Sequence, residues 1–118
     1  MTWLGDKINE LDNPGTPQAT ARAIGASFQP SADKYTLVQY TIQQTETTGQ
    51  DGTVKLLSDA ADPPVTERAQ ARCKNANAAD HIACTQLSYL VPPGHYVKLV
   101  ASGTGTNAIT QQVETAIS

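Results

Sequence analysis

Hydrophobic and polar positions alternate along much of this chain, most clearly just before the break Pro92-Pro93-Gly94. There the apolar side chains of Leu87, Tyr89 and Val91 recur at every second position, which is typical of a β-strand with one buried face. Proline supplies no amide and glycine accepts a positive φ, so the three residues after Val91 predict a tight turn. A second apolar run occupies residues 96–100. The pattern predicts a β-hairpin on which the core is built.

Short apolar and threonine-rich runs recur about every ten residues from residue 21 onward, with turn residues between them, as in an antiparallel sandwich or barrel. Strands are expected over residues 22–28, 35–45, 53–57, 65–73, 82–91, 95–101 and 107–117. A turn is expected at 49–52 and a loop at 58–64, because glycines and paired prolines end regular pairing. The segment 65–73 has a helix-friendly composition, but Val65, Glu67, Ala69, Ala71 and Cys73 share one side at period two, which favours a strand. We predict an all-β, jelly-roll-like antiparallel β-sandwich over residues 21–118.

Residues 1–20 differ from the rest and form a predicted N-terminal arm. Apolar side chains at near-helical spacing give it about two turns with one apolar face: Trp3, Leu4, Ile8 and Leu11. Asn13-Pro14-Gly15 and Pro17 end this segment. A helix so short is marginal alone in water, so an ordered arm must dock on something. Either it folds back onto the protein's own core, or it is an anchoring arm whose Trp3 is buried in a partner.

Composition limits the classes of function. The 118 residues make about one domain, and with one Phe and one Trp the core must rest on aliphatic residues and the four tyrosines. Stability is therefore expected to depend on partners. The net charge of −3 comes without any basic run, which argues against nucleic acid as a ligand. No signal-peptide-like apolar segment and no run of the roughly 18 apolar residues needed to span a membrane is present. We expect a soluble protein made in the cytoplasm.

Two cysteines, Cys73 and Cys84, flank a polar segment. They are either idle thiols in a reducing compartment or a disulfide, and we predict an oxidised pair in the mature protein, formed within one subunit or between neighbours. Adding His81 does not produce the ligand spacing of a structural zinc site. No metal site is expected.

Motifs that carry catalysis are not found in the sequence. The serines, cysteines and lysines lie outside the nucleophile motifs of known hydrolases. Residues 103–106, Gly-Thr-Gly-Thr, lack the following Gly-Lys-Ser/Thr of a phosphate loop and are predicted to form a hairpin loop. The acidic residues of the segment 59–67 do not follow a calcium-loop pattern, and His95 is expected to be an exposed turn residue. We expect no enzyme and no cofactor, with a small glycan-active or metal-dependent enzyme as the alternative class.

Taken together, these segments resemble the small β domain at the tips of bacteriophage tail fibres and related virion appendages. The matching segments are residues 26–31, 37–42, 49–57, 87–99, 105–106 and 111–113, of which 87–99 is the most specific. The chain departs from that family at His95, where an aromatic residue is common, at residues 113–115, and in its cysteine pair.

The resemblance implies a trimeric β-sandwich located on a virion. In that family the domain follows a long fibre shaft, whereas here about twenty residues precede it. The expected function is therefore that of a non-enzymatic structural protein, a capsid decoration or short head or neck fibre protein attached to other virion proteins through its arm. The alternative is a tail-fibre or baseplate tip that binds a host receptor or glycan.

Overall fold

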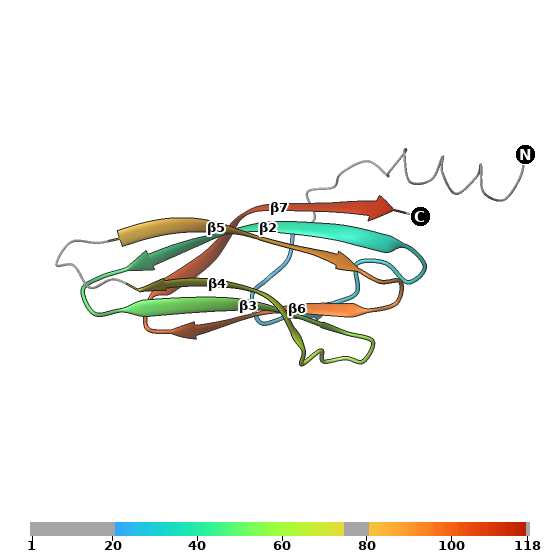
Figure 1. Cartoon of the computed structure of the whole chain (residues 1–118), viewed down its shortest axis with the longest axis horizontal. Coiled ribbons are helices and arrows are strands. Elements are labelled where there is room, and N and C mark those ends of the chain that lie inside the picture. Colours follow the sequence, from blue (N-terminus) through green and yellow to red (C-terminus); the bar gives the residue numbers. More distant parts are fainter. Residues whose placement is uncertain (1–20, 75–80, 118) are drawn as a thin grey trace, which may run out of the picture.

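The computed structural model of the chain describes residues 21–74 and 81–117, which form two packed β-sheets (Figure 1). The strands are β1 (Ser27–Phe28), β2 (Tyr35–Glu46), β3 (Asp51–Asp59), β4 (Glu67–Lys74), β5 (His81–Val91), β6 (Tyr96–Gly103) and β7 (Thr106–Ile117). The described residues contain no helix. The predicted all-β sandwich is confirmed.

All strand pairs are antiparallel, and the two sheets differ in size. One sheet has the order β1-β6-β3-β4 and the other the order β5-β2-β7. The long strand β2 is the centre of the smaller sheet, where it pairs with both β5 and β7 along most of its length. In the larger sheet β3 pairs with β4 and β6 in the same way.

The strand pairs are nested along the chain. β3 pairs with β4, β2 with β5, and β1 with β6, so that each pair encloses the one before it. This nested order, divided between two facing sheets, is typical of a jelly roll. Among the described residues no strand pairs with the outer edge of β7, so the β5-β2-β7 sheet has three strands while the facing sheet has four.

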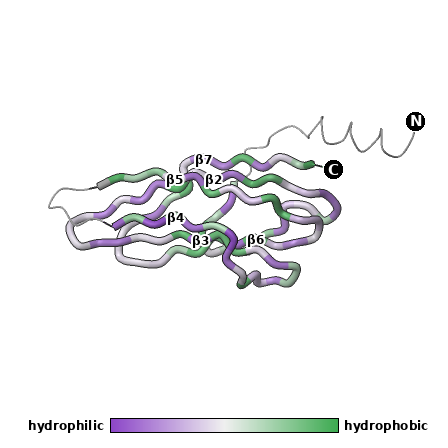
Figure 2. The backbone as a smooth tube through the Cα atoms, viewed as in Figure 1, coloured by the Kyte–Doolittle hydropathy of each residue, from purple (hydrophilic) through white to green (hydrophobic). Residues whose placement is uncertain are grey.

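Alternate side chains from both sheets point inward and form the core. Burial alternates strictly along β2 and β3, and Figure 2 shows hydrophobic and hydrophilic residues alternating along the strands of both sheets. The buried core consists of Val38, Tyr40, Ile42, Val54, Leu56, Ala71, Leu87, Val91, Val97 and Leu99. Leu87 and Val91 thus lie inside as their spacing predicted, and Tyr89 packs against them half-buried. The burial of these apolar surfaces is the main force that holds the sheets together.

The predicted hairpin at Pro92-Pro93-Gly94 is wrong, because β5 and β6 belong to different sheets. The turn carries the chain from one sheet to the other. Gly94 has the expected positive φ of 78°, and its amide donates to the Ser31 carbonyl at 2.9 Å. A hairpin needs amide donors beside its turn, and two consecutive prolines remove them. Both strands instead satisfy their backbone groups on β2 and β3.

The segment 103–106 is likewise a crossing between sheets and not the predicted hairpin loop, since β6 and β7 lie in opposite sheets. Gly103 has a φ of 96°, and a Cβ there would come within 2.5 Å of the Asp51 carbonyl oxygen. The amides of Thr104 and Gly105 donate to the same oxygen at 2.9 and 2.8 Å. Glycine is required at position 103 because the crossing packs tightly against the start of β3.

Three other boundaries differ from the prediction. Only Ser27–Phe28 of the expected first strand pairs, because Gly25 has a φ of 90° and turns the preceding residues out of line. β3 extends at both ends, from Asp51 to Asp59, and takes residues from the expected turn and loop. β4 is a strand, as predicted. A bulge opposite Leu56 and Leu57 shifts its register, however, so that Glu67 does not share the inner face with Ala69 and Ala71. Val65, which precedes the strand, is exposed as well.

The alternation along β3 gives a direct test of this fold. Leu56 is fully buried between the sheets, while its neighbour Leu57 is half-buried on the outer face. Leu56→Ala should lower the free energy of unfolding by about 2–5 kcal/mol, and Leu57→Ala by roughly 1 kcal/mol or less. Urea unfolding of both variants measures the difference. Equal losses would contradict the assigned inner face.

Candidate functional site

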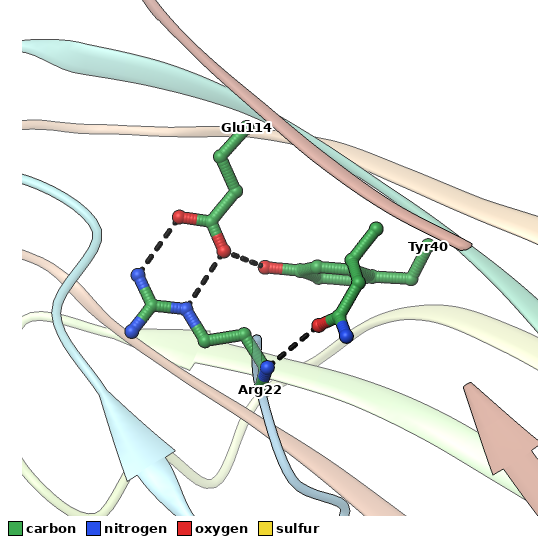
Figure 3. A network of polar contacts seen from close by, with 4 residues as sticks. Arg22, Tyr40 and Glu114 are labelled. Atoms are coloured by element: carbon green, nitrogen blue, oxygen red, sulfur yellow. Dashed lines mark hydrogen bonds and ion pairs between the residues drawn. The ribbon is translucent and has the colours of Figure 1, made fainter. Parts of the chain in front are cut away.

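A buried network of polar side chains joins the N-terminal end of the described chain to β2 and β7 (Figure 3). The guanidinium of Arg22 donates from Nε to Glu114 Oε2 and from Nη2 to Glu114 Oε1, both at 2.8 Å. The hydroxyl of Tyr40 donates to Glu114 Oε2 at 2.7 Å. The backbone amide of Arg22 donates to the side-chain oxygen of Gln112 at 2.6 Å. Glu114 is thus the shared acceptor of a cation and a phenol.

Burial makes this network strong. Tyr40 is fully buried, and the side chains of Glu114 and Arg22 are 6% and 20% exposed. A buried carboxylate is costly unless it is paired, and a two-pronged contact with arginine is the geometry that best offsets the cost. The hydrogen bond to Glu114 raises the pKa of Arg22. Burial, followed by the hydrogen bond to Glu114, raises the pKa of Tyr40 far above its ordinary value, so its hydroxyl remains a donor.

Arg22 also contacts the opposite sheet. Its guanidinium carbon lies 4.1 Å from the ring centroid of Phe28 in β1, a cation–π contact. The Phe28 ring in turn meets Tyr40 edge-on, with centroids 6.3 Å apart. One side chain therefore ties β1 of the larger sheet to β7 of the smaller one. It also determines where the chain that precedes residue 22 joins the body.

A second polar cluster lies inside the far end of the sandwich. Gln44 and Glu46 are fully buried on the inner face of β2. The Gln44 side-chain amide donates to the Gly52 carbonyl at 2.8 Å and to Asn107 Oδ1 at 3.1 Å. A Cβ on Gly52 would lie 2.7 Å from Glu46 Oε1, so a larger residue there would displace the Glu46 carboxylate. Burial, and then a hydrogen bond with Glu46, raises the pKa of the Cys73 thiol.

Both cysteines are free thiols in the structure. Cys73 is buried on the inner face of β4, while Cys84 is exposed on the outer face of β5, where it pairs with Gln43. The two side chains leave different faces of different sheets, so an internal disulfide would require β4 or β5 to move. The predicted bond within one subunit is not formed here. A bond between subunits stays a prediction, with Cys84 as its accessible thiol.

Two further sets of residues were considered from the sequence, the predicted anchoring side chains of the arm and the acidic loop. Trp3, Leu4, Ile8 and Leu11 lie outside the described residues. The acidic loop considered for calcium is described, and its Asp59 accepts the backbone amides of Val65 and Thr66 at 2.6 and 2.8 Å. Hydrogen bonds from Thr66 and Val65 lower the pKa of Asp59. Within residues 21–74 and 81–117 no group of three histidine, cysteine, aspartate or glutamate side chains is arranged to hold a metal ion.

Sequence reasoning missed Arg22, Glu46 and Glu114 as interior residues. Glu46 had a usable signal, since it continues the every-second-residue pattern of Val38, Tyr40 and Ile42. For Arg22 and Glu114 the sequence offers no such signal, because the two residues are far apart in the chain.

No family model, no curated protein and no solved structure matches this chain. In the part of the chain that the structure describes, no helix has the length and apolar character needed to cross a membrane.

Removing the charge of Glu114 tests the buried network. Glu114→Gln keeps the shape but leaves Arg22 without its counter-ion, and should lower the free energy of unfolding by about 2–4 kcal/mol. Tyr40→Phe, the matched control, removes one hydrogen bond and should cost about 1–2 kcal/mol. Chemical denaturation of the two variants compares them. A Glu114→Gln protein as stable as the wild type would contradict a structural role for the ion pair.

Native-state alkylation tests the two thiols. Cys84 is exposed and should react faster than Cys73 at neutral pH, whereas burial and the raised pKa should keep Cys73 unreactive until the protein unfolds. Mass spectrometry after timed labelling measures both rates, with Cys84→Ser as the control. Rapid labelling of Cys73 in the folded Cys84→Ser protein would refute its placement.

Proposed function

We propose that this protein is a non-enzymatic structural protein of a bacteriophage virion, a capsid decoration or a short head or neck fibre protein. Residues 21–118 form its β-sandwich body, and residues 1–20 attach it to other virion proteins. Its location is the virion, after synthesis in the host cytoplasm. The proposal is supported by the all-β body together with the resemblance of its segments to virion appendage domains.

The observation that carries the attachment role is the Arg22 network. A body held by one terminal segment transmits any load through the junction between the two. Here that junction contacts both sheets, through Glu114 of β7 and Phe28 of β1. A pull on the arm is therefore distributed over the whole sandwich and does not peel off a single edge strand.

A homotrimer is part of this proposal. Among the described residues, Tyr40 is the one fully buried aromatic side chain. Large aromatics dominate core energetics in small domains, so subunit contacts would add burial that one chain lacks. Association of identical subunits about one axis is the usual way to gain it.

Deleting residues 1–16 separates attachment from folding. We expect the truncated body to melt at the wild-type temperature, because the deletion stops short of the Arg22 network, and to be missing from purified particles. Trp3→Ala should weaken attachment by about a few kcal/mol if Trp3 is the buried anchor. Asp6→Asn, on a polar position of the same segment, is the control and should attach normally.

Three outcomes would redirect the proposal. A lowered melting temperature of the isolated truncated protein would favour an arm packed on its own body. A truncated body that melts normally and still enters particles would remove the arm from attachment altogether. Binding of the truncated body to host cells would favour the alternative, a receptor-binding tip.

A further inference from the structure

The two outer faces of the sandwich differ sharply in charge. The outward side chains of the β5-β2-β7 sheet follow from the register of β2 with its two neighbours. They are Tyr35, Leu37, Gln39, Thr41, Gln43 and Thr45 of β2, Ile82, Cys84, Gln86, Ser88 and Leu90 of β5, and Thr106, Ala108, Gln111, Val113, Thr115 and Ile117 of β7. Thr115 has an outward register but is covered, with 9% of its surface exposed. None of these side chains is charged at neutral pH. We name this surface the neutral face.

The outer face of the opposite sheet is rich in charge of both signs. Its outward side chains include Asp51, Lys55, Asp59, Glu67, Arg72, Lys74 and Lys98. Lys55 and Glu67 form an exposed ion pair there at 3.8 Å. Mixed charge is the ordinary composition of a solvated surface, and depletion of charge marks the centre of protein interfaces. The neutral face is therefore the unusual one.

Exposed apolar side chains also gather on the neutral face. Four large hydrophobic residues are exposed in the described chain, and three of them lie on this face: Tyr35 at 43%, Ile82 at 59% and Leu90 at 46%. Leu37 lies beside Leu90 in the register, and Ile117 lies beside Tyr35. Tyr35, Leu90 and their neighbours make one end of the face apolar, and Ile82 lies beside Thr45 at the opposite end. Between the two ends, glutamine, threonine and serine are mixed with the small or apolar residues Cys84, Ala108 and Val113.

The edges of the two sheets show the same contrast. The edge strand β4 carries Glu67, Arg68, Arg72 and Lys74, the charges that proteins use to keep edge strands from pairing with other chains. Edge strand β7 has Glu114 as its one charged residue, and that side chain points inward to Arg22. The sheet that bears the neutral face therefore lacks this protection at its β7 edge.

We propose that the neutral face is the surface through which copies of this chain pack against one another. The inference rests on the trimer of the proposed function and assigns the face that lines its axis. A second copy is the favoured occupant because faces without charge from neighbouring copies can meet around the axis without like-charge repulsion. Glutamine amides and threonine hydroxyls both donate and accept hydrogen bonds, so identical groups can pair with one another.

The size of the neutral face suits this role. Strand β2 has 12 residues, which span roughly 40 Å, and three strands are roughly 14 Å wide, a flat footprint of about 550 Å2. A flat footprint understates accessible area, so the area available to both neighbours in a trimer together is comparable with the roughly 800 Å2 that one protein contributes to a standard pairwise interface.

One substitution at the centre of the face tests the proposal. Thr41 lies in the middle of β2, between Gln86 and Gln111. In the full chain Thr41→Glu would place three carboxylates around one axis and should weaken self-association at least tenfold in sedimentation equilibrium at micromolar concentration. Thr53→Glu is the control, since Thr53 is also an outward threonine on an interior strand, but of the opposite sheet, where it lies between Arg72 and Ser102. It should associate like the wild type.

A second substitution guards against a folding defect. Gln86→Glu on edge strand β5 introduces the same charge beside Thr41 and should also shift the mass to that of a monomer, with an unchanged circular dichroism spectrum. Cys84 lies on the same face, so its alkylation should be slower in the wild-type assembly than in either dissociated variant. A dimer in place of a trimer, dissociated by both variants, would support the face and overturn the threefold symmetry.

Two results would overturn the inference. One is a wild-type protein that stays monomeric across the micromolar range, and the other is an assembly that Thr41→Glu and Gln86→Glu leave intact. Particle incorporation is a separate readout. A monomeric protein that still enters particles would refute the interface and leave attachment through the arm in place. An assembled protein that is absent from particles would support the interface and refute attachment to the particle.

Discussion

The carboxylate of Glu114 is the polar group on which the closed form of the sandwich depends. It lies inside the side of the sandwich where β7 faces β1, and without a partner it would be driven toward water. Arg22 supplies the charge, Tyr40 supplies a hydrogen bond, and Phe28 covers the guanidinium. Apolar burial draws the two sheets together along their length, while this network determines how they meet at one side.

The local hydrophobic pattern was sufficient to predict where most strands lie, but not which strands pair with one another. The alternation of residues 35–46 predicted β2 and its inner face, and the same period correctly favoured a strand for β4. The proline turn after Val91 was also placed correctly. Its flanking strands were paired wrongly, because sheet membership depends on which distant strand offers an open edge. The network around Arg22 could not be predicted for the same reason, since its partners are about ninety positions away.

The molecule presents different chemistry in different directions. Arg22, near the N-terminal end of the described chain, is held by Gln112 and Glu114 of β7. The outer face of β3, β4 and β6 is charged and suited to water, whereas the neutral face of β5, β2 and β7 carries no charged side chain. This division needs no catalytic group. It is the arrangement expected of a building block, in which surface composition and the position of the termini carry the function.

The nested strand order also sets a sequence of events in folding. Closing the short loop between β3 and β4 costs the least chain entropy, and each further pair, β2 with β5 and then β1 with β6, must close a longer one. β7 comes last in chain order among the described strands, yet it completes the sheet around β2 and delivers Glu114 to Arg22. The contacts of Arg22 with Gln112 and Glu114 therefore form only after β7 has docked, so a chain synthesised as far as β6 can hold a partly formed sandwich in which Arg22 still lacks its counter-ion.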